Sequence, residues 1–187
     1  MNKRVILASA SPRRREILAK TGIEFEVQVS NCDENIGVLE PDKLVMELSA
    51  LKANDVAEKN PDAIVIGSDT VVAHKGQIMG KPKSREEAIS MIKSFAGDVH
   101  QVYTGVTIVI PQSDNKITYN VCTDVHVLPM TDDEVERYVD TGEPMDKAGA
   151  YAIQGLFAPY ISKIDGDYYN VVGLPISSLY MILKEYL

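Results

Sequence analysis

Apolar and polar positions follow two periods along the chain, and these periods predict a mixture of strands and helices. Short apolar or alternating runs predict strands at residues 5–8, 25–29, 63–73, 100–110, 116–128 and 160–164. Helices are predicted at residues 12–20, 41–59, 84–95, 131–141 and 176–186, and Ser11, Ser84 and Thr131 are the capping residues of the first, third and fourth of them. Ser84 and Glu87 have the spacing of a capping box.

The order of these elements favours an α/β fold with a mixed, α+β-like sheet. Strands and helices follow one another without strict βαβ alternation, which disfavours a doubly wound parallel sheet. The strands at 100–110 and 116–128 form a hairpin around the polar residues 112–115. The sequence contains no internal repeat and no low-complexity linker.

The composition and charge argue against nucleic acid and membranes as binding partners. The chain has 187 residues, of which 45% are hydrophobic, and a net charge of −8. An acidic surface repels a nucleic-acid backbone, so we expect no nucleic-acid binding. No apolar run approaches the roughly 20 residues of a membrane span, and the apolar run at 5–10 is too short for a signal peptide. We therefore expect a cytoplasmic protein with no membrane partner.

A cluster of like charge at the start of the first helix breaks a local rule. A helix N-terminus favours negative charge, yet Arg13, Arg14 and Arg15 lie there. Free N–H groups beside arginines can bind a phosphate, with Ser9 and Ser11 as helix caps or phosphate ligands. An ordinary solvated basic cluster is the alternative. The P-loop pattern is missing.

Two charged residues interrupt apolar faces. Lys52 lies within the apolar arc of the helix at 41–59, where it must extend to solvent, pair with a carboxylate or face a ligand cleft. Asp69 lies within the apolar strand at 63–73, where a carboxylate needs hydrogen bonds, a cation or a cleft. A purely structural role for Asp69, bonded to nearby backbone, is the alternative.

Three polar residues near glycine-rich turns are weaker candidates. Lys81 and Lys147 each lie beside a turn, where most lysines are simply solvated. Gln154 lies among small apolar residues, and we expect its amide to be buried. A buried glutamine amide offers an acceptor and donors that match the N3–H and carbonyl edge of uracil or thymine, among other groups.

Six ordered blocks give the chain a family resemblance from end to end. The blocks are Leu7-Ala8-Ser9-Ala10-Ser11-Pro12-Arg13-Arg14, Gly67-Ser68-Asp69-Thr70-Val71-Val72, Gly80-Lys81-Pro82, Gly142-Glu143-Pro144-Met145-Asp146-Lys147-Ala148-Gly149-Ala150-Tyr151, Ile153-Gln154-Gly155 and Ile164-Asp165-Gly166-Asp167-Tyr168-Tyr169-Asn170-Val171-Val172-Gly173-Leu174-Pro175. With these blocks the chain resembles the Maf (septum-formation) family of nucleoside triphosphate pyrophosphatases.

This resemblance implies a fold and a reaction. The fold is an elongated mixed α/β fold similar to that of inosine triphosphatases, with two lobes around a central cleft and no separable linker, as one Maf-like domain over residues 1–187. The reaction is hydrolysis of a nucleoside triphosphate to the monophosphate and pyrophosphate with a divalent metal. The blocks around Lys147 and Gln154 resemble the branch that acts on dTTP, UTP and related pyrimidine nucleotides in a house-cleaning role.

The resemblance also assigns roles to residues. Asp69 matches the family's proton acceptor, whereas Arg13, Thr70 and Gln154 match positions linked to substrate choice. The residues Glu34, Lys52 and Lys81 match other cleft positions. Two departures stand out: Ser68 replaces the more usual alanine, and Phe157-Ala158-Pro159 replaces a more glycine-rich stretch beside the expected base pocket.

These roles combine into one mechanistic hypothesis. Arg13, Arg14, Lys52 and Lys81 hold the polyphosphate, and Asp69 with Glu34 holds Mg²⁺ or Mn²⁺ and orients a water that attacks the α-phosphorus. The sequence leaves open whether Asp69 is the general base or a metal ligand.

Three alternatives to the pyrimidine nucleotide reaction stay open. They are a pyrophosphatase for 7-methylguanosine triphosphate, one for deaminated purines such as ITP or XTP, and a septum-formation regulator that acts by binding protein. We expect a homodimer, as is common for small α/β enzymes.

Overall fold

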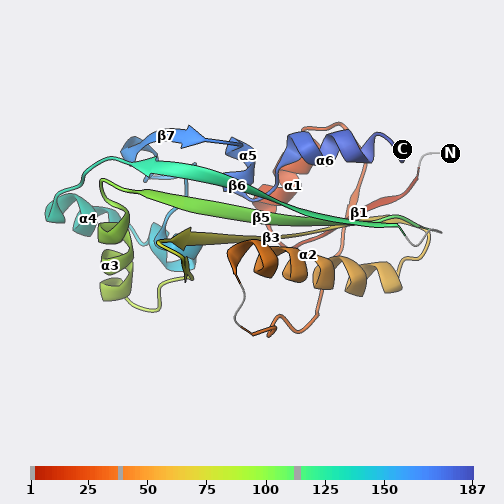
Figure 1. The fold of residues 1–187 in the computed structure, drawn as a ribbon, viewed down its shortest axis with the longest axis horizontal. Helices are drawn as coiled ribbons and strands as arrows, with labels where there is room; N and C mark the ends of the chain where they lie inside the picture. The colour runs from red at the N-terminus through yellow and green to blue at the C-terminus, as the bar shows by residue number, and fades with distance from the viewer. Residues whose placement is uncertain (1–2, 38–39, 112–114) are drawn as a thin grey trace. The chain divides into compact units, whose positions relative to one another are not determined.

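The fold was analysed in a computed structural model, which describes residues 3–37, 40–111 and 115–187 (Figure 1). The strands are β1 (Val5–Ala8), β2 (Glu26–Val27), β3 (Ile64–His74), β4 (Gln77–Met79), β5 (Val99–Val109), β6 (Lys116–Val127) and β7 (Ile161–Asp165). The helices are α1 (Pro12–Ala19), α2 (Pro41–Glu58), α3 (Arg85–Phe95), α4 (Asp132–Val139), α5 (Tyr168–Val172) and α6 (Ile176–Leu183). Short 3₁₀ turns are η1 (Glu143–Asp146), η2 (Ala148–Ala150) and η3 (Ala158–Tyr160).

The strands form one mixed sheet, which confirms the predicted fold class. In the described part of the chain this sheet has seven strands in the order β2-β1-β3-β5-β6-β7, and β4 pairs with β3. β1 runs parallel to both β2 and β3, whereas the pairs β3–β4 and β6–β7 are antiparallel. The predicted turn at 112–115 lies largely outside the described residues.

The chain divides into two compact units, each assembled from separate segments. Unit 1 comprises residues 1–70, 104–121 and 173–187, and unit 2 comprises residues 71–103 and 122–172. Strands β3, β5 and β6 each contribute residues to both units.

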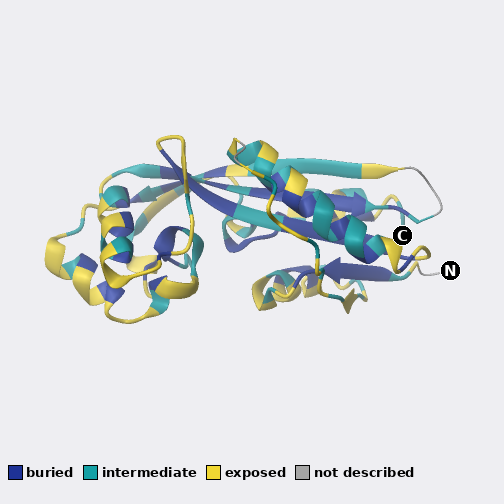
Figure 2. Cartoon of the chain, turned by 90° about the horizontal axis from the view of Figure 1, so that it is seen from below, coloured by how far each residue is buried: buried dark blue, intermediate teal, exposed yellow. Residues whose placement is uncertain are grey.

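In unit 1, helix α2 packs closely on the sheet because two glycines lie beneath it. A Cβ atom on Gly67 of β3 would lie 2.2 Å from the Ser49 carbonyl oxygen, and one on Gly105 of β5 would lie 2.1 Å from the Val45 carbonyl oxygen. Both distances are far below an ordinary contact. Larger residues would therefore hold α2 away from these strands, along which the buried residues are concentrated (Figure 2).

The core of unit 2 is aromatic. Phe95 and Phe157 are fully buried, and Phe157 packs against Tyr138 and Tyr151 with ring centroids 4.9 Å apart in each pair. His100 is also fully buried, and its Nε2 lies 2.7 Å from the Tyr151 hydroxyl. This cluster anchors the segment that carries Gln154.

Most predicted elements are present, and the differences have local causes. The strand predicted at 25–29 is reduced to Glu26–Val27, both of which are exposed. The capping box at Ser84 is incomplete, because the Glu87 carboxylate accepts from the Lys83 N–H at 2.7 Å instead of reaching back to the cap. The sequence pattern missed β4 and α5, which span only three and five residues. In the part of the chain that the structure describes, no helix is long and apolar enough to cross a membrane.

Candidate functional site

The candidate site in unit 1 is centred on β3 where this strand extends past the end of β1. The pairing of β1 with β3 ends at Ala8 and Gly67, and Ser68, Asp69 and Thr70 follow on β3. Ligands of open α/β sheets bind beyond the carboxyl ends of parallel strands. Because side chains alternate across a strand, Gly67 and Asp69 face α2, whereas Ser68 and Thr70 face the opposite side of the sheet.

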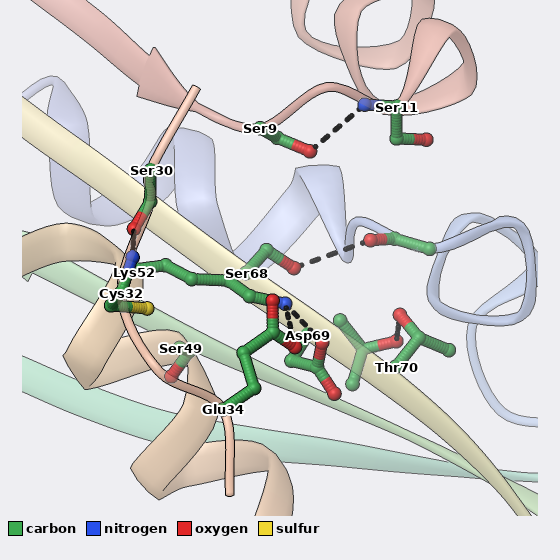
Figure 3. A network of polar contacts seen from close by, with 12 residues as sticks. Ser9, Ser11, Ser30, Cys32, Glu34, Ser49, Lys52, Ser68, Asp69 and Thr70 are labelled. Carbon is green, nitrogen blue, oxygen red and sulfur yellow. Dashed lines mark hydrogen bonds and ion pairs between the residues drawn. The ribbon is translucent and has the colours of Figure 1, made fainter. Parts of the chain in front are cut away.

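On the α2 side, one lysine joins two carboxylates. The Lys52 ammonium lies 2.7 Å from Asp69 Oδ1 and 3.0 Å from Glu34 Oε2 (Figure 3). The Lys52 and Asp69 side chains are only 15% and 14% exposed, whereas Glu34 is 54% exposed. Of the outcomes left open by the sequence, pairing with an opposite charge is the one observed for both residues, since Lys52 and Asp69 pair with each other.

On the opposite side of β3, Arg14 connects three segments of the unit. Its guanidinium donates to the Gly173 carbonyl at 2.8 Å, to Thr70 Oγ1 at 3.0 Å and to Ser9 Oγ at 3.4 Å. Thr70 Oγ1 also lies 2.9 Å from the hydroxyl of Thr104 on β5. Burial lowers the pKa of Arg14, and the nearby charge of Asp69 opposes this shift. All three acceptors are neutral oxygens, so these hydrogen bonds do not offset the charge of the guanidinium with a carboxylate.

The basic turn begins α1 as predicted. Ser11 is the N-cap residue, and its side chain accepts from the Arg14 N–H at 3.4 Å. Ser9 Oγ in turn accepts from the Ser11 N–H at 3.2 Å, as Figure 3 shows. Arg13 and Arg15 are exposed. Serine side chains therefore hold the backbone of this turn. Arg13 and Arg15 point to solvent, whereas Arg14 forms hydrogen bonds within the unit.

The remaining candidates belong to unit 2. Lys81 is exposed, and the half-buried Lys147 forms an ion pair with the neighbouring Asp146. Gln154 is exposed, so the expectation of a buried amide is wrong. The reason is local: the apolar neighbour Phe157 turns into the aromatic core, while Gln154 lies on the turn that the Gly155 N–H closes by donating to the Ala152 carbonyl at 3.0 Å.

Two residues of the site were missed by sequence reasoning. Gly173 accepts from both Arg14 and Ser68 through its carbonyl, the second at 3.3 Å. It belongs to one of the six family blocks, and its φ of 125° lies in the region that favours glycine. Thr104 gives no sequence signal, because a threonine is ordinary in a strand.

The acidic residues of the site could supply ligands to a hard cation. Within the described residues no group of three or more His, Cys, Asp or Glu side chains could hold a metal ion. Glu34 and Asp69 nevertheless approach a common point, the Lys52 ammonium. Mg²⁺ is usually held by one or two carboxylates with water and substrate phosphates, so the oxygen donors suit this ion, whereas the point on which they converge is occupied by Lys52.

Comparisons of the sequence identify full-length relatives. The chain is 47% identical over 186 residues to the dTTP/UTP pyrophosphatase of Lachnoclostridium phytofermentans, and the match covers 97% of this chain and 94% of that protein. It is 50% identical over 183 residues to the dTTP/UTP pyrophosphatase of Thermoanaerobacter sp., with 97% and 96% covered. The dTTP/UTP pyrophosphatase of Bacillus anthracis is 45% identical over 185 residues, with 98% and 96% covered.

Comparisons of the fold agree with the mixed α/β class. The Ham1 protein of Staphylococcus aureus aligns with 98% of this chain and 99% of its own, with a TM-score of 0.52 and 14% identity. A HAM1 protein from Coxiella burnetii aligns with 97% and 98%, with a TM-score of 0.55 and 13% identity. At this identity the likeness shows the fold alone.

One protein family matches almost the whole sequence. It is described as "Maf-like protein" and matches residues 4–186. This match agrees with the relatives at 45–50% identity and with the blocks that surround Ser9, Asp69 and Gln154. The chain belongs to the Maf family.

Proposed function

We propose that this chain hydrolyses dTTP and UTP to the corresponding monophosphate and pyrophosphate. The observation that carries the proposal is the pairing of Asp69 with Lys52 and Glu34 on β3, directly beyond the end of β1. Acid-anhydride hydrolysis needs cations to hold a polyphosphate and a carboxylate to act on water, and unit 1 provides both kinds of group. The names of the three relatives given above support the choice of nucleotide.

The cations have different tasks. Arg13 is exposed at the start of α1, where it can contact phosphate oxygens directly. Arg14 holds Thr70 and Ser9 in place and adds a charge that no carboxylate within its hydrogen-bonding network neutralises. We assign Lys81 and Lys147 of unit 2 to substrate binding as well, on the family resemblance alone.

Asp69 activates the water molecule that attacks the nucleotide. Lys52 holds Oδ1, and we assign Oδ2 to the attacking water, which it orients and from which it accepts a proton. The water oxygen forms a bond to the α-phosphorus, the bond from this phosphorus to the bridging oxygen breaks, and pyrophosphate leaves. Arg13 and Lys52 stabilise the charge that moves onto the leaving group.

A divalent cation fits the oxygen donors of the site. Glu34 would hold Mg²⁺ or Mn²⁺ together with substrate phosphates, and Asp69 would join it as a ligand only if it gave up its contact with Lys52 or with the water. Such an ion, when bound, supplies positive charge to the phosphate oxygens.

We propose that Gln154 recognises the base of the nucleotide. Its exposed amide can accept from the N3–H of uracil or thymine and donate to a ring carbonyl. Arg13 and Thr70 are the other specificity positions that we propose from the family resemblance.

A nucleotide panel tests this function. The purified chain is incubated with dTTP, UTP, CTP, GTP, ITP, XTP and 7-methyl-GTP in Mg²⁺, in Mn²⁺ and in EDTA, and pyrophosphate and orthophosphate are measured separately. We expect pyrophosphate from dTTP and UTP, and none in EDTA. Release of orthophosphate would contradict the reaction class. Release from 7-methyl-GTP alone, or from ITP and XTP alone, would contradict the substrate class.

A further inference from the structure

A carboxylate that has no role in the proposed reaction lies against the segment that carries Gln154. Glu143 lies at the start of η1. Its half-buried side chain reaches Leu156, which lies 13 residues further along the chain. Its Oε2 accepts from the Leu156 N–H at 2.9 Å, and its Oε1 accepts from the Tyr138 hydroxyl at 2.9 Å. Both partners belong to unit 2, as does Gln154.

The carboxylate lies so close to Gly155 that a side chain at this position would clash with it unless the carboxylate moved. A Cβ atom on Gly155 would lie 2.2 Å from Glu143 Oε2 and 2.5 Å from its Cδ. The Gly155 N–H donates to the Ala152 carbonyl at 3.0 Å, so the glycine also closes the turn that contains Gln154. Glu143 thus holds the backbone on the C-terminal side of Gln154 at two adjacent residues, by contact at Gly155 and by a hydrogen bond at Leu156.

The groups around Glu143 are themselves fixed. Tyr138 is 4% exposed, and its hydroxyl oxygen also lies 3.3 Å from the Ala150 carbonyl, a second possible acceptor for its one hydrogen. Burial raises the pKa of Tyr138, and the hydrogen bond to Glu143 raises it further, so this hydroxyl stays a donor at neutral pH. Phe157 is fully buried among aromatic rings just beyond the turn. The turn is therefore anchored on one side by the core and on the other by Glu143.

We propose that Glu143 is the positioning residue for base recognition, because its carboxylate fixes the turn that presents the exposed Gln154 amide to a pyrimidine. This inference rests on the proposed function and on the role of Gln154 within it. Without the carboxylate, the Leu156 N–H and the Tyr138 hydroxyl lose an acceptor and the turn gains freedom. Gln154 must then be ordered when the base binds, which weakens binding of the base but leaves the phosphate chemistry intact.

Two substitutions at Glu143 distinguish the effect of its hydrogen bonds from the effect of its negative charge. Glu143→Ala removes both hydrogen bonds. Glu143→Gln keeps them, because the amide oxygen can accept from the Leu156 N–H while the amide NH₂ donates to the Tyr138 oxygen. The Tyr138 hydroxyl hydrogen can then turn to the Ala150 carbonyl, which already lies within reach. A matched control is Glu136→Ala on α4, an exposed glutamate whose carboxylate lies 3.4 Å from Arg85.

The experiment measures steady-state kinetics with UTP and inhibition by UMP and by pyrophosphate. For Glu143→Ala we expect the KM for UTP and the inhibition constant of UMP to rise about 10-fold, the size of one lost interaction of about 1.4 kcal/mol, with kcat within about 2-fold of wild type. The inhibition constant of pyrophosphate, which has no base, should not change. Glu143→Gln and Glu136→Ala should behave like wild type.

A double variant tests the connection to Gln154. If Glu143 acts through Gln154, Glu143→Ala combined with Gln154→Ala should be no worse than Gln154→Ala alone. Independent, multiplying effects would overturn the inference, and so would an unchanged KM in Glu143→Ala or equal changes with UMP and pyrophosphate. A wild-type chain that releases no pyrophosphate from dTTP or UTP would refute the proposed function itself, and the inference with it.

Discussion

Gly67 offers a direct test of how the fold positions the reactive carboxylate. A methyl group at this position would place Cβ 2.2 Å from the Ser49 carbonyl oxygen and 2.7 Å from Ala53 N, both in the backbone of α2. Helix and strand would have to separate by about 1 Å to restore ordinary contacts. The free energy of unfolding should therefore fall by about 1–3 kcal/mol, the usual cost of overpacking.

The effects of Gly67→Ala can be measured by thermal unfolding and by turnover of UTP. For a chain of this size, the loss corresponds to a fall in Tm of about 3–10 °C. Turnover of UTP should also fall, by about 100-fold for a displacement of this size, because Lys52 on α2 and Asp69 on β3 would no longer be held at their contact distance. Calorimetry and pyrophosphate release on Gly67→Ala measure the two effects.

A second glycine provides the control for stability. A Cβ atom on Gly80 would have no atom within 4 Å, so Gly80→Ala should keep the wild-type Tm. If Gly67→Ala unfolds at the wild-type temperature and turns over UTP at the wild-type rate, the close approach of α2 to β3 does not position the site and the reasoning is refuted.

Three further variants test single interactions. Lys52→Met leaves the Asp69 carboxylate without its cation, and kcat/KM for UTP should fall by at least about 100-fold in the pyrophosphate assay; an unchanged value would remove Lys52 from the site. Burial lowers the pKa of His100 to about 3, so the unfolded chain binds an extra proton below about pH 6, and stability should fall by up to about 1.4 kcal/mol per pH unit between pH 6 and 4. Urea unfolding across this range should show a shallower slope for His100→Phe, and equal slopes would contradict the assignment. Hydrogen bonds, the largest from Lys59, lower the pKa of Asp55 to about 2, so this carboxylate stabilises the fold above about pH 4 and loses that effect as the pH falls towards 2. Asp55→Asn should therefore lower the Tm at pH 7 but not at pH 2, and an equal fall at both would argue against it.

Local patterns were sufficient to predict elements whose signals are contained in one segment. The capped helix α1 and the buried strand β1 lie where capping and hydrophobic periodicity place them. The strand β2 was overestimated, because alternation in an exposed segment does not by itself supply a pairing partner. The spacing of Ser84 and Glu87 predicted a capping box, but Glu87 bonds to Lys83 instead, since two backbone N–H groups compete for one carboxylate.

The site was predictable residue by residue but not as an arrangement. Lys52 and Asp69 were each recognised as charges in apolar surroundings, and their pairing depends on the packing of α2 over Gly67. The exposure of Gln154 depends on the direction in which Phe157 turns, which no local pattern specifies. Glu143 lies in one of the six family blocks, but its role could not be predicted because its partner Leu156 lies in a separate turn of the chain.

The assignment of the chemistry to Asp69 is tested most directly by one substitution. Asp69→Asn keeps the size of the side chain and its bond to Lys52 but removes the proton acceptor, so kcat for dTTP and UTP should fall by about 10²–10⁴-fold with an unchanged circular dichroism spectrum. The control Asp62→Asn changes an exposed carboxylate that contacts only Arg4 among the described residues, at 3.6 Å, and should keep full activity. Wild-type turnover of both nucleotides by folded Asp69→Asn would contradict the account.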